Sequence, residues 1–257
     1  MTTRRAFLAG CLAAALWPRR ARAIGPASQF RFGELTIGGL PQPGTPRALS
    51  LTRLGTQIDL RTSIDVARVA SAPVQLHSPK LFETPFLYMA ADRRFPIPPA
   101  RDLEALRRFL TFGGFLVIDS AEGRAGGEVD ASVRQLVAEV FPPATGLAPL
   151  SEDHVIYKTF YLLAGAPGRV AVSKDLEGVT RDDRTVIVYN QNDMAGAWAK
   201  DDFGNFAYPC YPGGERQREL AIRLGINLVM YALCLDYKTD QVHVPFILKR
   251  RKWKVDD

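Results

Sequence analysis

Apolar and polar residues alternate near the start of the chain and then recur at helical spacing. Residues 29–37 alternate with a period of two, which predicts a strand, and a Gly/Pro-rich loop follows over 38–46. Leu51, Leu54 and Ile58 lie on one face of a predicted helix over 47–60. A short second strand is expected over 62–66.

Later segments alternate between buried strands and amphipathic helices. Residues 84–90 and 114–118 are continuous apolar runs, typical of parallel strands that are covered on both faces, and 185–189 supplies another strand. Helices are predicted from residue 98 to 110, over 130–140 and over 215–235. This alternation predicts one α/β domain over residues 24–240, with three layers: a mainly parallel sheet and helices on both of its faces.

The first 23 residues have the pattern of an export signal. Arg4 and Arg5 precede a short apolar region that ends at Trp17, and a small-x-small cleavage site follows at residues 21–23. The arginine pair before Phe7 and Leu8 predicts a twin-arginine signal, whose route carries folded proteins. We therefore expect a periplasmic or otherwise extracytoplasmic protein. The apolar run is shorter than the ~20 residues of a membrane-spanning helix, and no transmembrane helix is expected.

Two other interpretations of this segment stay open. An ordinary secretory signal can contain two adjacent arginines by chance. The segment Leu8-Ala-Gly-Cys11 also resembles a lipoprotein box, although the apolar residues continue beyond Cys11 and leave little apolar sequence before it. Neither alternative changes the expectation of export.

Removal of the signal changes the charge of the protein. The chain has 33 basic and 27 acidic residues, and subtracting the five arginines of residues 1–23 leaves 28 basic against 27 acidic. The mature protein is therefore nearly neutral, and we expect no nucleic-acid binding. Five of the remaining basic residues lie within 249–254, in a basic C-terminal extension over 241–257.

Polar residues follow two of the predicted strands. In an open parallel sheet, ligands bind beyond the carboxyl ends of the strands, which selects a candidate cleft there. Asp119, Ser120 and Glu122 follow one strand, and Asn192 and Asp193 follow another. His154 and Trp198 complete the candidate cleft. Carboxylates and a histidine can perform acid-base chemistry or hold a cation.

Each of these residues also has a structural interpretation. Asp119 can cap the following loop or helix, His154 can be a hydrogen-bonded structural histidine, and Asp193 can belong to a turn. The chain has no Walker-type phosphate loop, no G-x-S-x-G, no H-E-x-x-H and no Cys-x-x-Cys. We therefore expect no cofactor and assign no metal site.

The stretch from Leu106 to Asp119 resembles a bacterial family described as a domain of unknown function, whose members occur as twin-arginine-exported proteins. Residues 79–88, 153–161, 192–198 and 223–233 also fit its pattern. The family is similar in fold to class I glutamine amidotransferases, in which a helix-strand unit leads to a cysteine nucleophile. Here the corresponding turn is Asp119-Ser120-Ala121, so the resemblance implies the fold without thiolate chemistry.

Two functions follow as hypotheses. The first is a non-catalytic binding or scaffolding domain of the cell envelope, with the strand-end cleft as its site. The extension over 241–257 could then contact an envelope protein or weakly touch an anionic membrane surface. The alternative is a periplasmic hydrolase in which Asp119, Glu122, His154 and Asp193 converge, with His154 as the base that would activate Ser120.

Overall fold

A seven-stranded sheet runs through the protein. The computed structural model describes residues 29–40, 45–67, 72–142 and 146–234. The predicted export signal over 1–23 and the extension over 241–257 lie outside these ranges. The strand order is β2-β1-β3-β4-β7-β6-β5. The first five strands in this order are mutually parallel, β6 pairs antiparallel with β7, and β5 pairs antiparallel with β6.

The central strands are buried along their whole length, as their apolar sequences predict. These are β3 (Phe86–Ala91) and β4 (Phe115–Ser120), and β7 (Arg184–Asn190) pairs with the far edge of β4. The outer strands are shorter: β1 (Gly33–Leu35), β2 (Ala72–Val74), β5 (Ala148–Pro149) and β6 (Glu177–Arg181).

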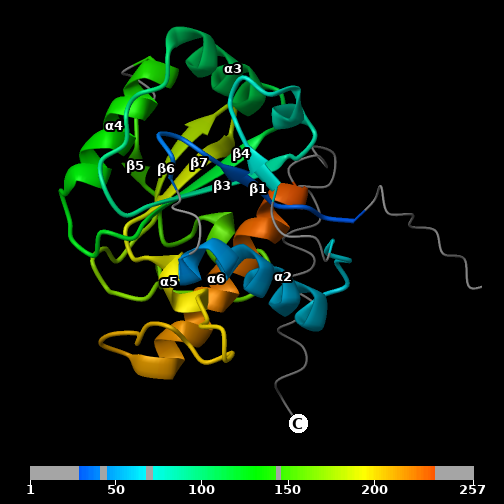
Figure 1. Cartoon of the computed structure of the whole chain (residues 1–257), viewed down its shortest axis with the longest axis vertical. Coiled ribbons are helices and arrows are strands. Elements are labelled where there is room, and N and C mark those ends of the chain that lie inside the picture. The colour runs from blue at the N-terminus through cyan, green and yellow to red at the C-terminus, as the bar shows by residue number, and fades with distance from the viewer. Residues whose placement is uncertain (1–28, 41–44, 68–71, 143–145, 235–257) are drawn as a thin grey trace, which may run out of the picture.

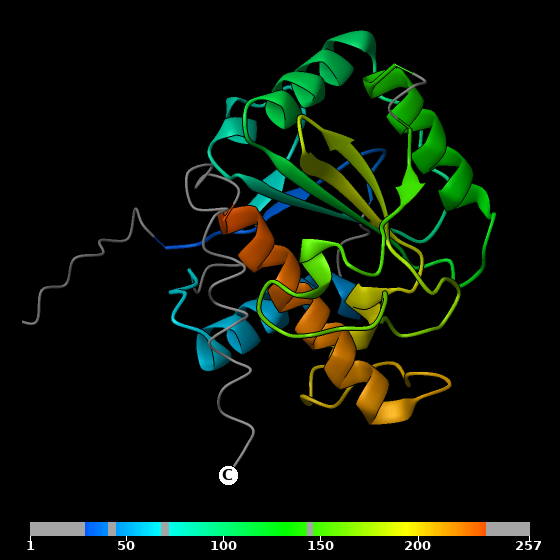
Figure 2. The ribbon, with the colours of Figure 1, turned by 180° about the vertical axis from the view of Figure 1, so that it is seen from behind.

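Helices cover both faces of the sheet (Figures 1 and 2). One face packs against α3 (Ala100–Thr111) and α4 (Glu128–Val140). The other packs against α2 (Ser50–Arg61), the short α5 (Met194–Trp198) and the long α6 (Gly214–Cys234). Alternate residues of each central strand enter the two resulting cores, so the prediction of a three-layer α/β structure is confirmed.

Some predicted elements differ from the structure. The strand expected over 29–37 is reduced to β1 and an isolated bridge between Phe30 and Val66. The strand expected over 62–66 is likewise reduced to that bridge at Val66, because the Thr62 hydroxyl donates to the carbonyl of Ile58 at 2.8 Å and closes α2. In the described ranges, no helix has the length and apolar character needed to cross a membrane.

Candidate functional site

Asp119 lies at the end of β4 and fastens the start of α5 to the sheet. Its side chain is fully buried. Oδ1 accepts the backbone N–H of Met194 at 2.9 Å, and Oδ2 accepts that of Ala195 at 2.8 Å. The Tyr88 hydroxyl on β3 donates to Oδ2 at 2.7 Å. Three donors from two elements therefore converge on one carboxyl group.

Asp193 is the centre of a buried ionic cluster. Its carboxylate pairs with Arg47, at 3.0 Å from Nε to Oδ1 and 2.7 Å from Nη2 to Oδ2, and with Nε of Arg169. It also accepts the N–H of Gly196 at 2.8 Å, as the N-cap of α5. The Arg47 guanidinium stacks over the ring of Tyr208 at 4.3 Å. The cluster (Asp119, Asp193, Arg47 and Arg169) ties three separate segments to α5.

The electrostatics of the cluster favour protonation of Asp119. Burial, assisted by the nearby charge of Asp193, raises the pKa of the Asp119 carboxyl from 3.8 to about 7. The hydrogen bonds from Ala195, Tyr88 and Met194 oppose this rise. A carboxyl with such a pKa could exchange protons, but every one of its polar neighbours is already part of the α5 attachment.

The side-chain amide of Asn192 makes its hydrogen bonds to one loop, residues 166–173. Its Oδ1 accepts the backbone N–H groups of Val172 and Ser173 at 2.7 and 2.9 Å. Its Nδ2 donates to the carbonyl of Ser173 at 2.7 Å and to that of Ala166. Since an asparagine amide offers two donors and two acceptor positions, the hydrogen-bonding capacity of this side chain is used up.

Glu122 caps a helix. Its carboxylate accepts the N–H groups of Glu128 and Val129, each at 3.0 Å, at the first turn of α4, and it pairs with Arg124. Partial burial would raise the pKa of Glu122, but these backbone hydrogen bonds and Arg124 lower it below its ordinary value of 4.5. The side chain therefore stabilises the helix start in its ionised form.

Replacement of this cap has a predictable effect. We expect Glu122→Ala to lower the free energy of unfolding by about 1 kcal/mol at neutral pH, because two backbone donors lose their acceptor. The loss should shrink as the pH falls through the pKa that Glu122 has in the folded protein, because a depressed pKa contributes its full stability only above the unfolded pKa and none below the folded pKa. Chemical denaturation at neutral pH and at a pH below the folded pKa of Glu122 measures this loss. Glu139→Ala, at the exposed end of the same helix, is the control.

His154 lies at the opposite end of the sheet from Asp119. It begins a short 3-10 helix, where its Nδ1 accepts the N–H of Ile156 at 3.2 Å, and its Nε2 lies 3.0 Å from Oγ1 of Thr185. Thr185 is near the start of β7, whereas Asn190 at its end pairs with Asp119. Five residues of strand separate these ends, which is roughly 16 Å.

The structure therefore brings together only part of the predicted cleft. Asp119, Asn192 and Asp193 are neighbours at the strand ends, but they are fully or almost fully buried. The expected convergence with His154 is wrong, because His154 belongs to the other end of the sheet. Ser120, whose Oγ lies 3.4 Å from the backbone nitrogen of Glu122, consequently cannot use His154 as its base.

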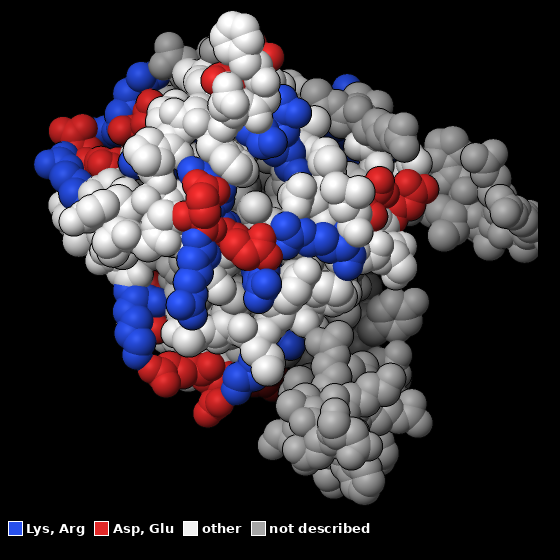
Figure 3. Space-filling model, turned by 90° about the horizontal axis from the view of Figure 1, so that it is seen from below, with Lys and Arg blue, Asp and Glu red and all other residues white. Residues whose placement is uncertain are grey.

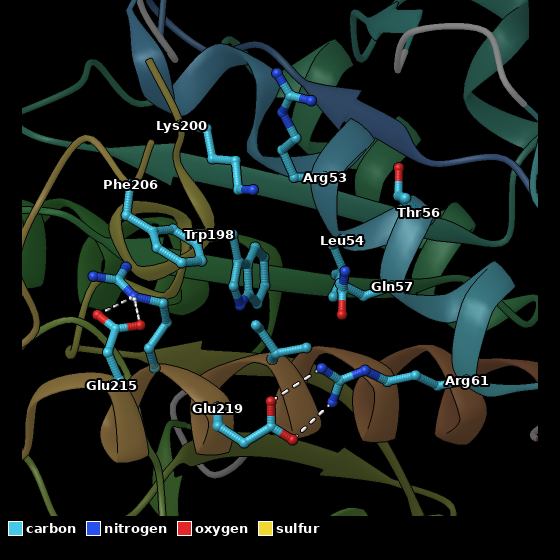
Figure 4. A pocket seen from close by; sticks show the side chains of 12 residues that line it. Arg53, Leu54, Thr56, Gln57, Arg61, Trp198, Lys200, Phe206, Glu215 and Glu219 are labelled. Atoms are coloured by element: carbon cyan, nitrogen blue, oxygen red, sulfur yellow. Dashed lines mark hydrogen bonds and ion pairs between the residues drawn. The ribbon is translucent and has the colours of Figure 1, made fainter. Parts of the chain in front are cut away.

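Trp198 faces a different cavity, which we call the helix-face pocket. It has a volume of about 290 Å³ and lies between α2, the end of α5, the segment 200–206 and α6. Figure 4 shows the indole ring of Trp198 in the middle of the lining side chains, with Phe206 on one side and Leu54 on the other. Gly225 permits this arrangement, because a Cβ atom there would lie 2.7 Å from both Leu54 and Trp198.

Most charged groups of the helix-face pocket are paired with one another. Glu219 accepts hydrogen bonds from Nη1 and Nη2 of Arg61, at 2.7 and 3.0 Å, and from Nε of Arg223 at 2.8 Å. The buried Arg218 donates hydrogen bonds from each of its guanidinium nitrogens. Nε donates to Glu215, Nη1 to the carbonyl of Ala197 at 2.6 Å, and Nη2 to that of Tyr208 at 2.8 Å. On the face seen from below, basic side chains lie beside acidic ones (Figure 3).

Two buried donors of the helix-face pocket have no acceptor. Trp198 is 2% exposed, and its Nε1 has no hydrogen-bond partner in the described part of the chain. Nε of Arg53 is buried and equally without an acceptor. A buried donor that makes no hydrogen bond costs about 1–3 kcal/mol, so such atoms are uncommon in native structures and need a partner that the described residues do not supply.

Comparison with known proteins places this fold in a family. A family described as a domain of unknown function, DUF4159, matches residues 41–233. The chain belongs to the DUF4159 family. The buried ionic cluster and the helix-face pocket both lie within the matched residues, so both are built from the family's own domain.

Other comparisons of this DUF4159 protein add little. A search of curated proteins finds no match. Among solved structures, alpha-L-fucosidase isoenzyme 2 from Paenibacillus thiaminolyticus aligns with 82% of this chain at 11% sequence identity and a TM-score of 0.32. The alignment spans 34% of that enzyme's length, and at such a TM-score it supports no inference about activity.

Several important residues of the DUF4159 domain carry no sequence signal. Arg47 lies in a short 3-10 helix and Arg169 in a loop, both far from Asp193 in the chain, and only the fold brings the three together. Arg53 and Lys200 look like ordinary surface cations in the sequence. The one available signal is Trp198, because tryptophan is enriched at binding interfaces.

Proposed function

We propose that this DUF4159 protein is a non-catalytic binding domain of the cell envelope that holds its ligand in the helix-face pocket. The observation that carries this proposal is the pair of buried donors without acceptors, Nε1 of Trp198 and Nε of Arg53, which line the same pocket. A ligand that enters the pocket with an acceptor atom would satisfy groups that the described residues leave unsatisfied.

The strand-end residues support binding rather than catalysis. Asp119, Asp193 and Asn192 make hydrogen bonds that attach α5 and the loop over 166–173, and none of them lines the helix-face pocket. A general base must reach the proton that it removes, and a buried carboxyl occupied by three donors does not offer that access. Their role is to hold α5, and with it Trp198, in place.

Export and envelope location belong to the same proposal. The support is the arginine pair and apolar region of residues 1–23, which fit a route that carries folded proteins. Residues 106–119 resemble a family that implies a class I glutamine amidotransferase-like fold, and the turn Asp119-Ser120-Ala121 has no cysteine nucleophile, which agrees with a binding role. A contact between residues 241–257 and an envelope protein stays a prediction.

A fragment screen tests the binding site. We expect that, among small anionic, neutral and cationic fragments, at least one class raises the melting temperature of the full-length protein. Thr56 lines the pocket and is exposed, so Thr56→Phe should fill the cavity and abolish the effect. Thr52→Phe is the matched control, because Thr52 is exposed on the same helix and lies outside the lining.

Two outcomes would contradict the proposal. If the fragments stabilise Thr56→Phe as strongly as Thr52→Phe, binding takes place elsewhere on the protein. If no fragment of any charge class stabilises the wild-type protein, the helix-face pocket is a packing feature without a ligand.

A further inference from the structure

The hydrogen-bonding groups of the helix-face pocket require an acceptor. Of the side chains described, four buried nitrogen or oxygen atoms lack partners, and the two nitrogens among them both line this pocket. The two oxygens, on Asp130 and Asp175, lie elsewhere. A ligand that complements the pocket must therefore bring oxygen atoms that accept hydrogen bonds.

The charges of the helix-face pocket require a negative ligand. Arg53 and Lys200 make no ion pair with any acid in the described ranges, whereas both acids of the pocket, Glu215 and Glu219, are already paired with arginines. Lys200 lies over the ring of Phe206 at 4.9 Å. Lys200 and Arg53 occupy one side of the Trp198 indole, and the Arg61–Glu219 pair occupies the other (Figure 4).

The remaining lining is apolar. Leu54, Ile222 and Trp198 form the inner wall, and the partly exposed Phe206 forms an edge. The volume of about 290 Å³ is at the small end for ligand pockets. A hydrated inorganic anion would leave the apolar wall uncovered, and a neutral apolar molecule would leave two cations without a partner.

We infer that the helix-face pocket binds a carboxylate attached to a compact apolar body. The carboxylate would lie against Arg53 and Lys200 on one side of the Trp198 indole, while the apolar body would cover Leu54 and Ile222. This inference rests on the proposed function and adds the chemical class of the ligand. The same chemistry is offered by a free aromatic or aliphatic acid and by the carboxyl terminus of a peptide that ends in an apolar residue.

Calorimetric titration of the full-length protein separates the contributions of charge and apolar surface. The probes are phenylbutyrate, its neutral amide, acetate and inorganic phosphate. We expect phenylbutyrate to bind, and the amide, acetate and phosphate each to bind at least roughly tenfold more weakly. Arg53→Gln and Lys200→Gln should each weaken phenylbutyrate binding by roughly tenfold, because each removes a charged donor. Lys80→Gln is the matched control, since Lys80 is exposed and lies outside the pocket.

Peptide probes identify the source of the carboxylate. A short N-acetylated peptide that ends in phenylalanine is compared with the same peptide amidated at its carboxyl terminus. Tighter binding of the free-acid peptide than of phenylbutyrate supports a peptide terminus, and the reverse order supports a free acid. Equal binding of the free and amidated peptides overturns the requirement for a carboxylate.

The outcomes distinguish failure of this inference from failure of the proposed function. If the neutral amide binds as tightly as phenylbutyrate and Thr56→Phe blocks both, the pocket is a binding site but its ligand is not a carboxylate. The same conclusion follows if acetate or phosphate matches phenylbutyrate. If none of these probes binds although other fragments do, only the ligand class is wrong. If no fragment binds at all, both the ligand class and the proposed function are wrong.

Discussion

Replacing Asp193 with asparagine is expected to lower the free energy of unfolding by about 3 kcal/mol or more, because it leaves two arginines facing an uncharged group in a buried site. Arg47 and Arg169 both pair with this carboxylate, whose side chain is fully buried. Asparagine keeps an oxygen for the N–H of Gly196 and tolerates the left-handed backbone at φ 57°. The variant therefore isolates the effect of the charge.

Asp183→Asn is a matched control for this experiment. Asp183 also has a left-handed backbone, at φ 60°, but its side chain is exposed in the turn between β6 and β7. Urea denaturation of both variants should show a large loss for Asp193→Asn and a change within about 0.5 kcal/mol for Asp183→Asn. Equal, small losses for the two variants would mean that the buried ionic cluster does not hold α5 in place.

Replacing Asp119 with alanine is expected to lower the free energy of unfolding by roughly 3 kcal/mol, because three buried donors lose their acceptor. These donors are the N–H groups of Met194 and Ala195 and the hydroxyl of Tyr88. Tyr88→Phe removes only one of the three contacts and leaves the two backbone donors satisfied. It should therefore cost about 1 kcal/mol, measured by the same denaturation experiment.

The pH dependence of this loss follows from the raised pKa of Asp119. The folded protein binds the proton of this carboxyl more tightly than the unfolded chain, so ionisation lowers stability as the pH rises from 3.8 to about 7. The alanine variant lacks this group. The difference in stability between wild type and Asp119→Ala should therefore be larger at about pH 5 than at about pH 8. A larger difference at the higher pH would show that the hydrogen bonds outweigh burial and that Asp119 is stable as a carboxylate.

Much of the fold could be predicted from the sequence because its main elements bury one continuous apolar surface. The strands around Leu87, Val117 and Ile187 are apolar on both faces, and the helices that cover them have a clear apolar stripe. Polar and very short elements are harder to find. β6 is polar at several positions, and α5 has only five residues, most of them small, so neither has a period that a sequence pattern reveals.

The candidate site was harder to predict than the fold. The rule that ligands bind at strand ends located Asp119 and Asp193 correctly in space, but it could not show that the N–H groups of α5 and two distant arginines would occupy them. His154 was misplaced because nothing in its local sequence indicates which end of the sheet its loop reaches. The helix-face pocket depends on contacts between α2 and α6, and 152 residues lie between the end of α2 and the start of α6.

Chemical-shift mapping of the isotope-labelled full-length protein tests most directly whether the ligand site is the helix-face pocket or the strand-end cleft. The fragment that stabilises the protein most is titrated, and the indole signal of Trp198 is assigned with Trp198→Phe. We predict shifts of this indole N–H and of backbone amides around Arg53 and Arg218, with little change at Asn192. Shifts centred on Asn192, Met194 and Ala195, without movement of the Trp198 indole, would contradict the account and return the site to the strand ends.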